Sequence, residues 1–374
     1  MHKRSRWRIA TVLGAFAAAF LPLDVLLGML GLILLDRAEG RVPQDIEEVD
    51  REFRVAHPYY SHDLVPGFDG FAQWGPARYT MRTNSLGFRD SSARQVPVSA
   101  GVRRILFIGD SFTEGLGVDY ESSFAERLAA TLAPAGIELL NAAVVTYSPA
   151  IYWKKIEYLV TRQLVQFDAV VVFFDISDIQ DEALSYRIDD EGHVAEMPEG
   201  PVDALGTWRR HSFTYRAVER AVQRLHPHPP WIGCSNAEAN RPICRSAWTL
   251  SRVAMDRYGR EGLIRADRHM TRLAELLRAE GIPLTIVVYP WPQQLLWNDR
   301  SSVQVSYWQR WAQRERAQAI DLFTPFLAEA DRLGAIGAID RYFLDGDMHW
   351  NARGHKLVAD NLQRHFRAPS ISPP

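Results

Sequence analysis

Three residues of this chain have the side-chain types and the settings needed for acyl transfer. Ser111 follows the apolar run 105–108 and precedes a helical pattern at 124–132. A serine held between a strand and a helix can expose its hydroxyl as a nucleophile. His349 lies far downstream, with Asp347 two residues before it. A histidine can take the proton of the serine, and an aspartate can orient the histidine and stabilise its charged form.

Each of these residues also has a simpler interpretation. Ser111 can be the capping serine of an ordinary strand-to-helix turn, and His349 can be a histidine of the core. Asp345 competes with Asp347 as the acid partner of the histidine. A phosphate-binding loop is disfavoured because the turn has neither a Gly-Lys-Ser/Thr ending nor a Gly-x-Gly-x-x-Gly motif.

Two sequence blocks resemble those of a known family. The tripeptide Gly109-Asp110-Ser111 and the block 347–350 (Asp-Met-His-Trp) resemble motifs of the SGNH/GDSL hydrolases. This family contains serine esterases, lipases and carbohydrate O-acetyl esterases. The resemblance covers roughly residues 84–366, which is most of the chain. Many members carry Asp-x-x-His, whereas Asp-x-His-Trp is similar to the relatives of alginate O-acetyltransferases.

The resemblance also implies a role for each residue. Ser111 is the expected nucleophile, His349 the base and Asp347 the acid. The expected oxyanion donors are the backbone N–H groups of Ser111 and Thr146 and the side chain of Ser177. Thr146 stands where the family has glycine, and a β-branched residue resists a positive φ. Ser177 stands where the family has asparagine, and its hydroxyl reaches less far.

The chain alternates strand and helix patterns, which favours a parallel sheet covered on both faces. With the resemblance, the expected fold is α/β: a flavodoxin-like three-layer α/β/α sandwich with a parallel sheet, plus an N-terminal membrane helix. Active sites of such sheets lie at the carboxyl ends of the strands. Strands are expected at 104–109, 137–142, 168–174, 283–289 and 319–323, and helices near 121–133, 149–165, 250–280, 302–318 and 351–367.

The expected domain order starts with a membrane segment. The divisions are a cytoplasmic basic tail at 1–8, a transmembrane anchor at 9–35, a linker and N-terminal extension at 36–100, and an SGNH hydrolase-like catalytic domain at 101–368 with an insertion at 179–249. Within the extension, residues 84–90 (Asn-Ser-Leu-Gly-Phe-Arg-Asp) resemble an element that precedes the Gly-Asp-Ser strand in many anchored members. Arg89 is expected to shape the rim of the pocket; a plain turn is the alternative.

The N-terminal segment bears on location. Basic residues at 2–8 precede an apolar stretch at 9–35, which is long enough for a spanning helix of about 20 residues. A cleaved signal peptide is the alternative, although its apolar region is only about 7–15 residues long. Positive charges before the span place the N-terminus in the cytoplasm. We therefore expect a single pass through the inner membrane, with the catalytic domain periplasmic or extracellular.

Cysteines, charge and composition set further bounds. Cys234 and Cys244 bracket a short polar loop and predict one local disulfide, with two free buried cysteines as the alternative. No cofactor is expected, and no set of residues has metal-ligand spacing. The 374 residues are 47% hydrophobic, enough for a large core. A formal net charge of −2 gives no reason to expect nucleic acid.

These features predict an extracytoplasmic serine esterase. By the resemblance, the substrate is an O-acyl ester, in particular an O-acetyl ester, of an envelope or secreted polysaccharide, so the expected partner is an acylated carbohydrate. Trp291, Trp297 and Trp350 either stack on sugar rings or pack in the core. Two other functions stay open: a polysaccharide O-acetyltransferase, and a non-catalytic carbohydrate-binding or assembly protein.

Overall fold

The computed structural model describes residues 19–28, 52–197, 212–215 and 245–366. Its centre is a sheet of five parallel strands in the order β11-β10-β7-β5-β6. Numbered along the chain and read from the β6 edge, this order is 2-1-3-4-5, the flavodoxin-like arrangement. The strands are β5 (Arg103–Ile108), β6 (Ile137–Asn141), β7 (Ala169–Phe174), β10 (Leu284–Val288) and β11 (Gln318–Asp321).

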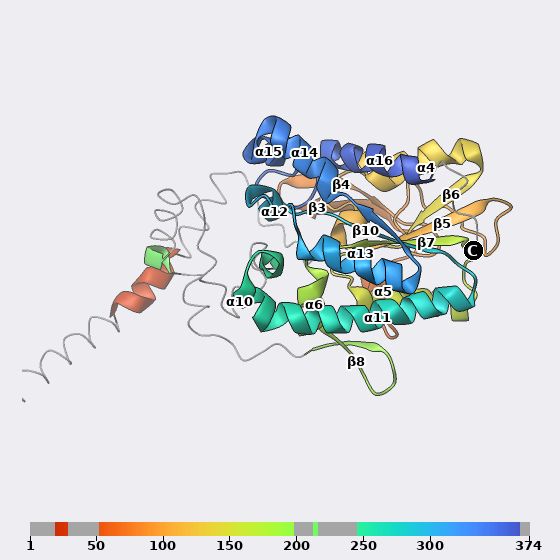
Figure 1. The fold of residues 1–374 in the computed structure, drawn as a ribbon, viewed down its shortest axis with the longest axis horizontal. Helices are drawn as coiled ribbons and strands as arrows, with labels where there is room; N and C mark the ends of the chain where they lie inside the picture. Colours follow the sequence, from red (N-terminus) through yellow and green to blue (C-terminus); the bar gives the residue numbers. More distant parts are fainter. Residues whose placement is uncertain (1–18, 29–51, 198–211, 216–244, 367–374) are drawn as a thin grey trace, which may run out of the picture. The chain divides into compact units, whose positions relative to one another are not determined.

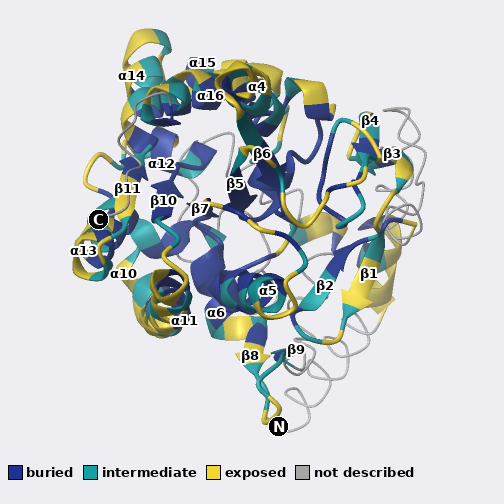
Figure 2. Ribbon diagram, turned by 90° about the vertical axis from the view of Figure 1, so that its right-hand side faces the viewer, coloured by how far each residue is buried: buried dark blue, intermediate teal, exposed yellow. Residues whose placement is uncertain are grey.

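Helices cover both faces of this sheet (Figure 1). The helices α4 (Phe124–Leu132) and α16 (Ala352–Phe366) pack together on one face, and α5 (Pro149–Thr161), α11 (Arg260–Ala279) and α13 (Val303–Glu315) lie on the other. Every residue of the central strand β7, with the sequence Ala-Val-Val-Val-Phe-Phe, is buried. A strand covered on both faces needs such a continuous apolar run. Figure 2 shows the dark blue strands between helices that expose their outer sides.

Shorter elements complete the fold. The remaining helices are α3 (Ser111–Glu114), α6 (Asp178–Leu184), α10 (Arg252–Ala254), α12 (Pro292–Leu296), α14 (Phe323–Leu333) and α15 (Ala335–Tyr342). Short 3₁₀ turns occur at η1 (Tyr120–Ser122), η2 (Ala133–Ala135) and η5 (Ala247–Thr249), and the π-helical turn η6 (Met255–Gly259) joins α10 to α11. The antiparallel pairs are β1 (Arg54–His57) with β2 (Ser61–Leu64), β3 (Asp69–Trp74) with β4 (Ala77–Arg82), and β8 (Tyr186–Ile188) with β9 (Val194–Glu196).

The expected α/β fold with a parallel sheet is confirmed, and each of its five strands begins and ends within two residues of its expected limits. The expected helices are also present, although 250–280 is divided at the π-helical turn. The region predicted as linker and extension contains the hairpins β1–β2 and β3–β4. Helices α6, α12, α14 and α15 were not expected.

The chain divides into two compact units, residues 45–198 with 245–374, and residues 1–44 with 199–244. In the second unit, residues 19–28 are helical, and Asp24 accepts hydrogen bonds from the backbone and hydroxyl of Thr214. Among the described residues, none of the helices has the length and apolarity needed to cross a membrane. Most of the predicted anchor, and both Cys234 and Cys244, lie outside the described residues, so the anchor and the disulfide stay predictions.

Candidate active site

The structure brings the three predicted catalytic residues together. Ser111 Oγ lies 2.9 Å from His349 Nε2, and His349 Nδ1 lies 2.5 Å from Asp347 Oδ1. Because a carboxylate only accepts hydrogen bonds, Nδ1 carries the proton and Nε2 presents its lone pair to the serine hydroxyl. Asp345 is exposed and makes no hydrogen bond or ion pair with any described residue. Asp347 is therefore the acid that orients the histidine.

The predicted nucleophile, Ser111, lies on a tight strand-to-helix turn. Ser111 begins the short helix α3 directly after β5, and the Asp110 side chain caps this helix by accepting from the Phe112 N–H. A Cβ on Gly109 would lie 2.4 Å from Thr113 Oγ1 and 3.0 Å from the Phe173 carbonyl oxygen. Glycine is needed there because the turn passes so close to the helix and to β7. The motif is thus explained by packing as well as by chemistry.

Asp347 is held as an anion. Burial alone raises the pKa of its carboxyl group, but hydrogen bonds from the His349 ring, the His349 backbone N–H and the indole of Trp74 lower the pKa to about 2. The carboxylate therefore stays ionised at neutral pH. A fixed negative charge beside the imidazole stabilises the imidazolium that forms when the histidine takes a proton.

Two of the three expected oxyanion donors are open. Among the described residues, no acceptor is bonded to the backbone N–H of Ser111 or of Thr146. Thr146 adopts a φ of 63°, the left-handed conformation that its β-branched side chain disfavours by about 1–3 kcal/mol. The backbone geometry expected for a glycine is therefore reached by a threonine. Strain of this kind persists only where the surroundings fix the conformation.

Several side chains fix the oxyanion loop, defined here as residues 142–147. Glu114 Oε2 accepts the Val145 N–H at 2.7 Å, and Arg54 clamps the same carboxylate with bonds of 2.8 and 3.0 Å. Although burial raises it, the Arg54 guanidinium holds the pKa of Glu114 below its usual value. His62 Nε2 lies 2.9 Å from the Val145 carbonyl oxygen and 3.3 Å from Thr146 Oγ1. The loop is thus tied both to the nucleophile helix and to the N-terminal hairpin.

Ser177, the third predicted oxyanion donor, is hydrogen-bonded within its own turn. Its hydroxyl donates to Asp175 Oδ1 at 2.6 Å, and its backbone N–H donates to the same oxygen at 2.7 Å. Asp175 stands where the family has glycine, and Trp291 Nε1 donates to its other oxygen at 2.8 Å. A serine has one hydroxyl proton, so Ser177 has none left for an oxyanion in this arrangement. The prediction for Ser177 changes because the Asp175 carboxylate, two residues earlier in the same turn, accepts its hydroxyl proton.

A cluster of buried acids lies behind the nucleophile. One carboxylate oxygen from each of Asp110, Asp175 and Asp178 lies within 4.8 Å of the others. Burial and the neighbouring acids raise the pKa values of Asp110 and Asp178 well above the usual range. This is the direction expected for like charges held together, because each charge disfavours ionisation of its neighbours. Tyr289 and Tyr152 donate to Asp110 and Asp178, respectively.

Other residues singled out from the sequence have structural roles. Arg89 is 1% exposed and donates to the carbonyl oxygens of Glu114, Gly115 and Val118, so it braces the chain after the nucleophile instead of forming the pocket rim. Of the tryptophans considered for sugar stacking, Trp291 and Trp350 are buried and Trp297 is half-buried.

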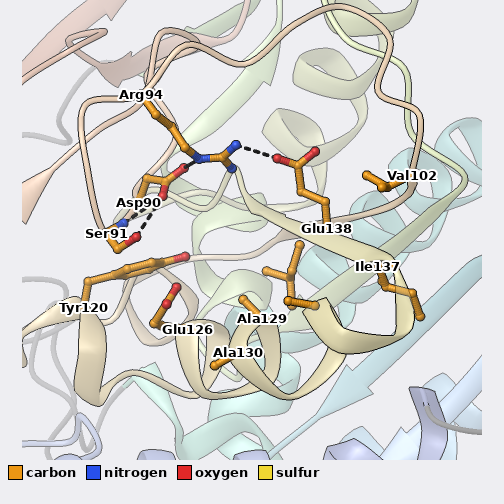
Figure 3. A pocket seen from close by; sticks show the side chains of 13 residues that line it. Asp90, Ser91, Arg94, Val102, Tyr120, Glu126, Ala129, Ala130, Ile137 and Glu138 are labelled. Carbon is orange, nitrogen blue, oxygen red and sulfur yellow. Dashed lines mark hydrogen bonds and ion pairs between the residues drawn. The ribbon is translucent and has the colours of Figure 1, made fainter.

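A pocket of about 390 Å³ lies beside β6 and α4 (Figure 3). Arg94 crosses it between two acids, bonded to Asp90 at 2.8 Å and to Glu138 at 2.5 Å. None of the three triad residues lines it. Its charged side chains are therefore largely paired with one another, and we assign it no role in the chemistry.

Sequence reasoning missed the residues that support the site from the N-terminal extension. The acid Asp347 is contacted by Trp74, and the oxyanion loop by His62. Glu114, which holds that loop, is contacted by Arg54. Their separations from these partners, 273, 83 and 60 residues, place the contacts beyond any local pattern. A signal was available only in the turn-rich, aromatic character of the extension.

No protein-family model and no curated protein matches the chain. Solved structures align with about 70–75% of it. One is a lipolytic G-D-S-L family member from Veillonella parvula (15% identity, 71% of this chain and 100% of that chain, TM-score 0.39). A second is a lipase/acylhydrolase from Enterococcus faecalis (12% identity, 73% of this chain and 99% of that chain, TM-score 0.40). A third is a catalytic mutant of an acetylxylan esterase from Geobacillus stearothermophilus (12% identity, 75% of this chain and 100% of that chain, TM-score 0.42). At this distance, the chemistry has to be inferred from the geometry of the site itself.

Proposed function

We propose that the protein is a serine esterase that hydrolyses O-acyl esters. The observation that carries this proposal is the continuous chain of hydrogen bonds from Ser111 Oγ through His349 to Asp347. The backbone N–H groups of Ser111 and Thr146 accompany it, and within the described part of the chain neither of them is bonded to an acceptor. This combination supplies a nucleophile, a base and donors for a developing negative charge, which is what acyl transfer requires.

In the proposed reaction, Ser111 Oγ attacks the ester carbonyl carbon while its proton passes to His349 Nε2. The N–H groups of Ser111 and Thr146 stabilise the oxyanion. His349 then gives the proton to the leaving alcohol, and the acyl group stays on Ser111. Water, deprotonated by His349, attacks the acyl-enzyme, the bond between the acyl carbon and Ser111 Oγ breaks, and His349 returns the proton to Ser111 Oγ as the acid leaves. Asp347 remains ionised throughout and stabilises the imidazolium in both steps.

We propose an O-acetylated envelope or secreted polysaccharide as the substrate, on the strength of the motif resemblance. A polysaccharide O-acetyltransferase is the second candidate, favoured by the two-residue spacing of the Asp-x-His-Trp block. The two differ only in whether water or a sugar hydroxyl attacks the acyl-enzyme. The non-catalytic candidate is disfavoured because its site would have no need for an aligned serine and histidine.

One assay separates these candidates. The purified protein is incubated with 4-nitrophenyl acetate, with and without oligosaccharide, beside Ser111→Ala as the matched control. Release of acetate independent of the sugar, and absent in the control, is the expected result. Acetylated sugar as the main product would establish the transferase, and no release above the control would leave only the binding function.

We also propose that residues 9–35 anchor the protein in the inner membrane, with the catalytic unit outside the cytoplasm. The basic residues before this apolar stretch support that orientation. The full-length protein should stay with membranes after a high-salt wash, and a C-terminal reporter should work only if it is of a periplasmic type. Release of a shorter soluble form would instead indicate a cleaved signal peptide.

A further inference from the structure

We infer that Trp74, on the β3–β4 hairpin, is a positioning residue that holds the catalytic acid in place. The inference rests on the proposed function, because it concerns the same triad. The indole Nε1 of Trp74 donates to Asp347 Oδ2 at 2.8 Å, across 273 residues of sequence. Trp74 therefore acts through Asp347 and belongs to a segment outside the part of the chain that carries the family motifs.

Trp74 completes the coordination of the carboxylate. Asp347 Oδ1 accepts from His349 twice, from the ring at 2.5 Å and from the backbone N–H at 2.8 Å. Only Oδ2 remains, and it receives the indole N–H. An indole nitrogen donates and never accepts, so this contact favours the ionised acid. Hydrogen bonds to charged groups are also stronger than those between neutral groups.

The acid needs such support because of where it lies. Asp347 is in the loop between α15 and α16, and its side chain is 24% exposed, against 5% for His349. Inside the loop, the Asp347 N–H donates to the Leu344 carbonyl oxygen and the Leu344 N–H to that of His349. These bonds fix the backbone of the loop, but they leave Asp347 Oδ2 without a hydrogen-bond donor from the loop itself. The indole occupies that oxygen instead.

The ring of Trp74 also contacts the base. Its plane stands at 85° to the His349 imidazole, with the ring centroids 5.4 Å apart. Phe112 approaches the same imidazole, with the centroids 4.9 Å apart. Trp74 thus limits the orientation of both the acid and the histidine, and Phe112 adds a contact from the nucleophile helix.

The hairpin that carries Trp74 is fixed to the segment after the nucleophile. Thr80 donates from its backbone and its hydroxyl to Asp119 Oδ1, at 2.8 and 2.9 Å. Gly117 has a φ of 79°, and a Cβ there would lie 2.6 Å from Leu344 Cδ1 and 3.8 Å from Trp74 Cδ1. A residue without a side chain therefore lets the hairpin and the acid loop approach each other.

The test is Trp74→Phe, which keeps an aromatic ring and removes the N–H. With 4-nitrophenyl acetate, we expect kcat to fall about 10–100-fold, the loss expected for a hydrogen bond to a charged group, with KM nearly unchanged. The matched control is Phe71→Leu on the same hairpin; Phe71 is 51% exposed and packs on Arg78, and its replacement should leave kcat within about 2-fold. Trp74→His, which retains a ring N–H, should recover part of the loss.

Two further readouts separate positioning from general damage. In an Asp347→Ala background, Trp74→Phe should cause little additional loss, because the residues act as a unit. The low-field proton resonance of His349 Nδ1–H should move in Trp74→Phe and stay in Phe71→Leu. A wild-type kcat in Trp74→Phe would overturn the role proposed for Trp74 but not the triad. So would a loss of kcat that is equally large in the wild-type and Asp347→Ala backgrounds. Full activity of Asp347→Ala itself would overturn the proposed triad as well.

Discussion

The two sides of Ser111 differ in how their polar groups are bonded. On one side, called here the relay side, hydrogen bonds join Ser111 to His349 and His349 to Asp347. The indole of Trp74 donates to the second oxygen of that aspartate, Oδ2. On the oxyanion side, the backbone N–H groups of Ser111 and Thr146 are without acceptors in the described residues, and Ser177 is bonded to Asp175.

This difference shows where the chain can depart from the motifs that it resembles and still keep the polar groups of the candidate site. Every residue except proline supplies a backbone N–H, so threonine in place of glycine at 146 retains the donor. A side-chain donor depends on the residue type and on its neighbours, and the single hydroxyl proton of Ser177 is bonded to Asp175. We infer that the oxyanion hole works through backbone groups, and the predictions below test that contrast.

The largest effect is expected on the relay side. Ser111→Ala and His349→Ala should each lower kcat/KM by roughly 10⁴-fold or more, and the double variant should be hardly worse, because the pair acts as a unit. The measurement is ester hydrolysis at saturating and limiting substrate. Hydrolysis by Ser111→Ala within 10-fold of the wild type would exclude this serine as the nucleophile.

The next effect distinguishes the two candidate acids. Asp347→Ala should lower kcat by about 10³–10⁴-fold, since the histidine loses both its tautomer and its orientation. Asp345→Ala is the matched control in the same loop, and its exposed side chain predicts a change within about 2-fold. The opposite ranking would show that the histidine turns toward Asp345 during catalysis.

The pKa of Asp347 predicts a pH dependence of stability. The pKa falls from 3.8 to about 2 on folding, so the ionised acid contributes about 2 kcal/mol to the free energy of unfolding. This contribution is complete above the unfolded-state pKa and is lost as the pH falls through the folded-state value. Denaturant unfolding of the wild type should therefore weaken more between pH 4 and pH 2 than that of Asp347→Asn. Parallel curves for the two proteins would contradict the assignment.

A smaller effect is expected at Ser177. Its hydroxyl is bonded to Asp175, so Ser177→Ala should change kcat by less than about 3-fold and cost about 1 kcal/mol of stability. Kinetics and thermal unfolding of the same preparation measure both quantities. A loss above 10-fold in kcat and kcat/KM together would mean that the hydroxyl leaves Asp175 to stabilise the transition state.

The smallest effect is expected at Thr146. Glycine keeps the backbone N–H and adopts a positive φ without strain, so Thr146→Gly should retain kcat within about 3-fold. The same ester assay measures it. An inactive Thr146→Gly with a normal fold would show that the threonine side chain, which contacts His62 and Tyr186, is itself required.

The sequence predicted what local patterns encode. The buried strands appear as apolar runs such as 169–174, and the motif blocks identified Ser111, Asp347 and His349. Helix α14 escaped notice because Pro325 interrupts its pattern, although proline is tolerated in the first turn of a helix.

The support of the site had no local signal. Trp74 reaches Asp347 across 273 residues, and the bond from Ser177 to Asp175 depends on the rotamer within one turn. A sequence shows that such donors exist but not which acceptor each of them meets. The hairpin contacts therefore had to be found in the structure.

The central claim is that Ser111 is the activated nucleophile. A fluorophosphonate reacts covalently with such a serine, and mass spectrometry of the digested protein locates the adduct. We predict one adduct per chain, on the peptide containing Ser111, with labelling abolished in Ser111→Ala and strongly slowed in His349→Ala. An unlabelled wild-type protein, or equal labelling of Ser111→Ala, would contradict the claim.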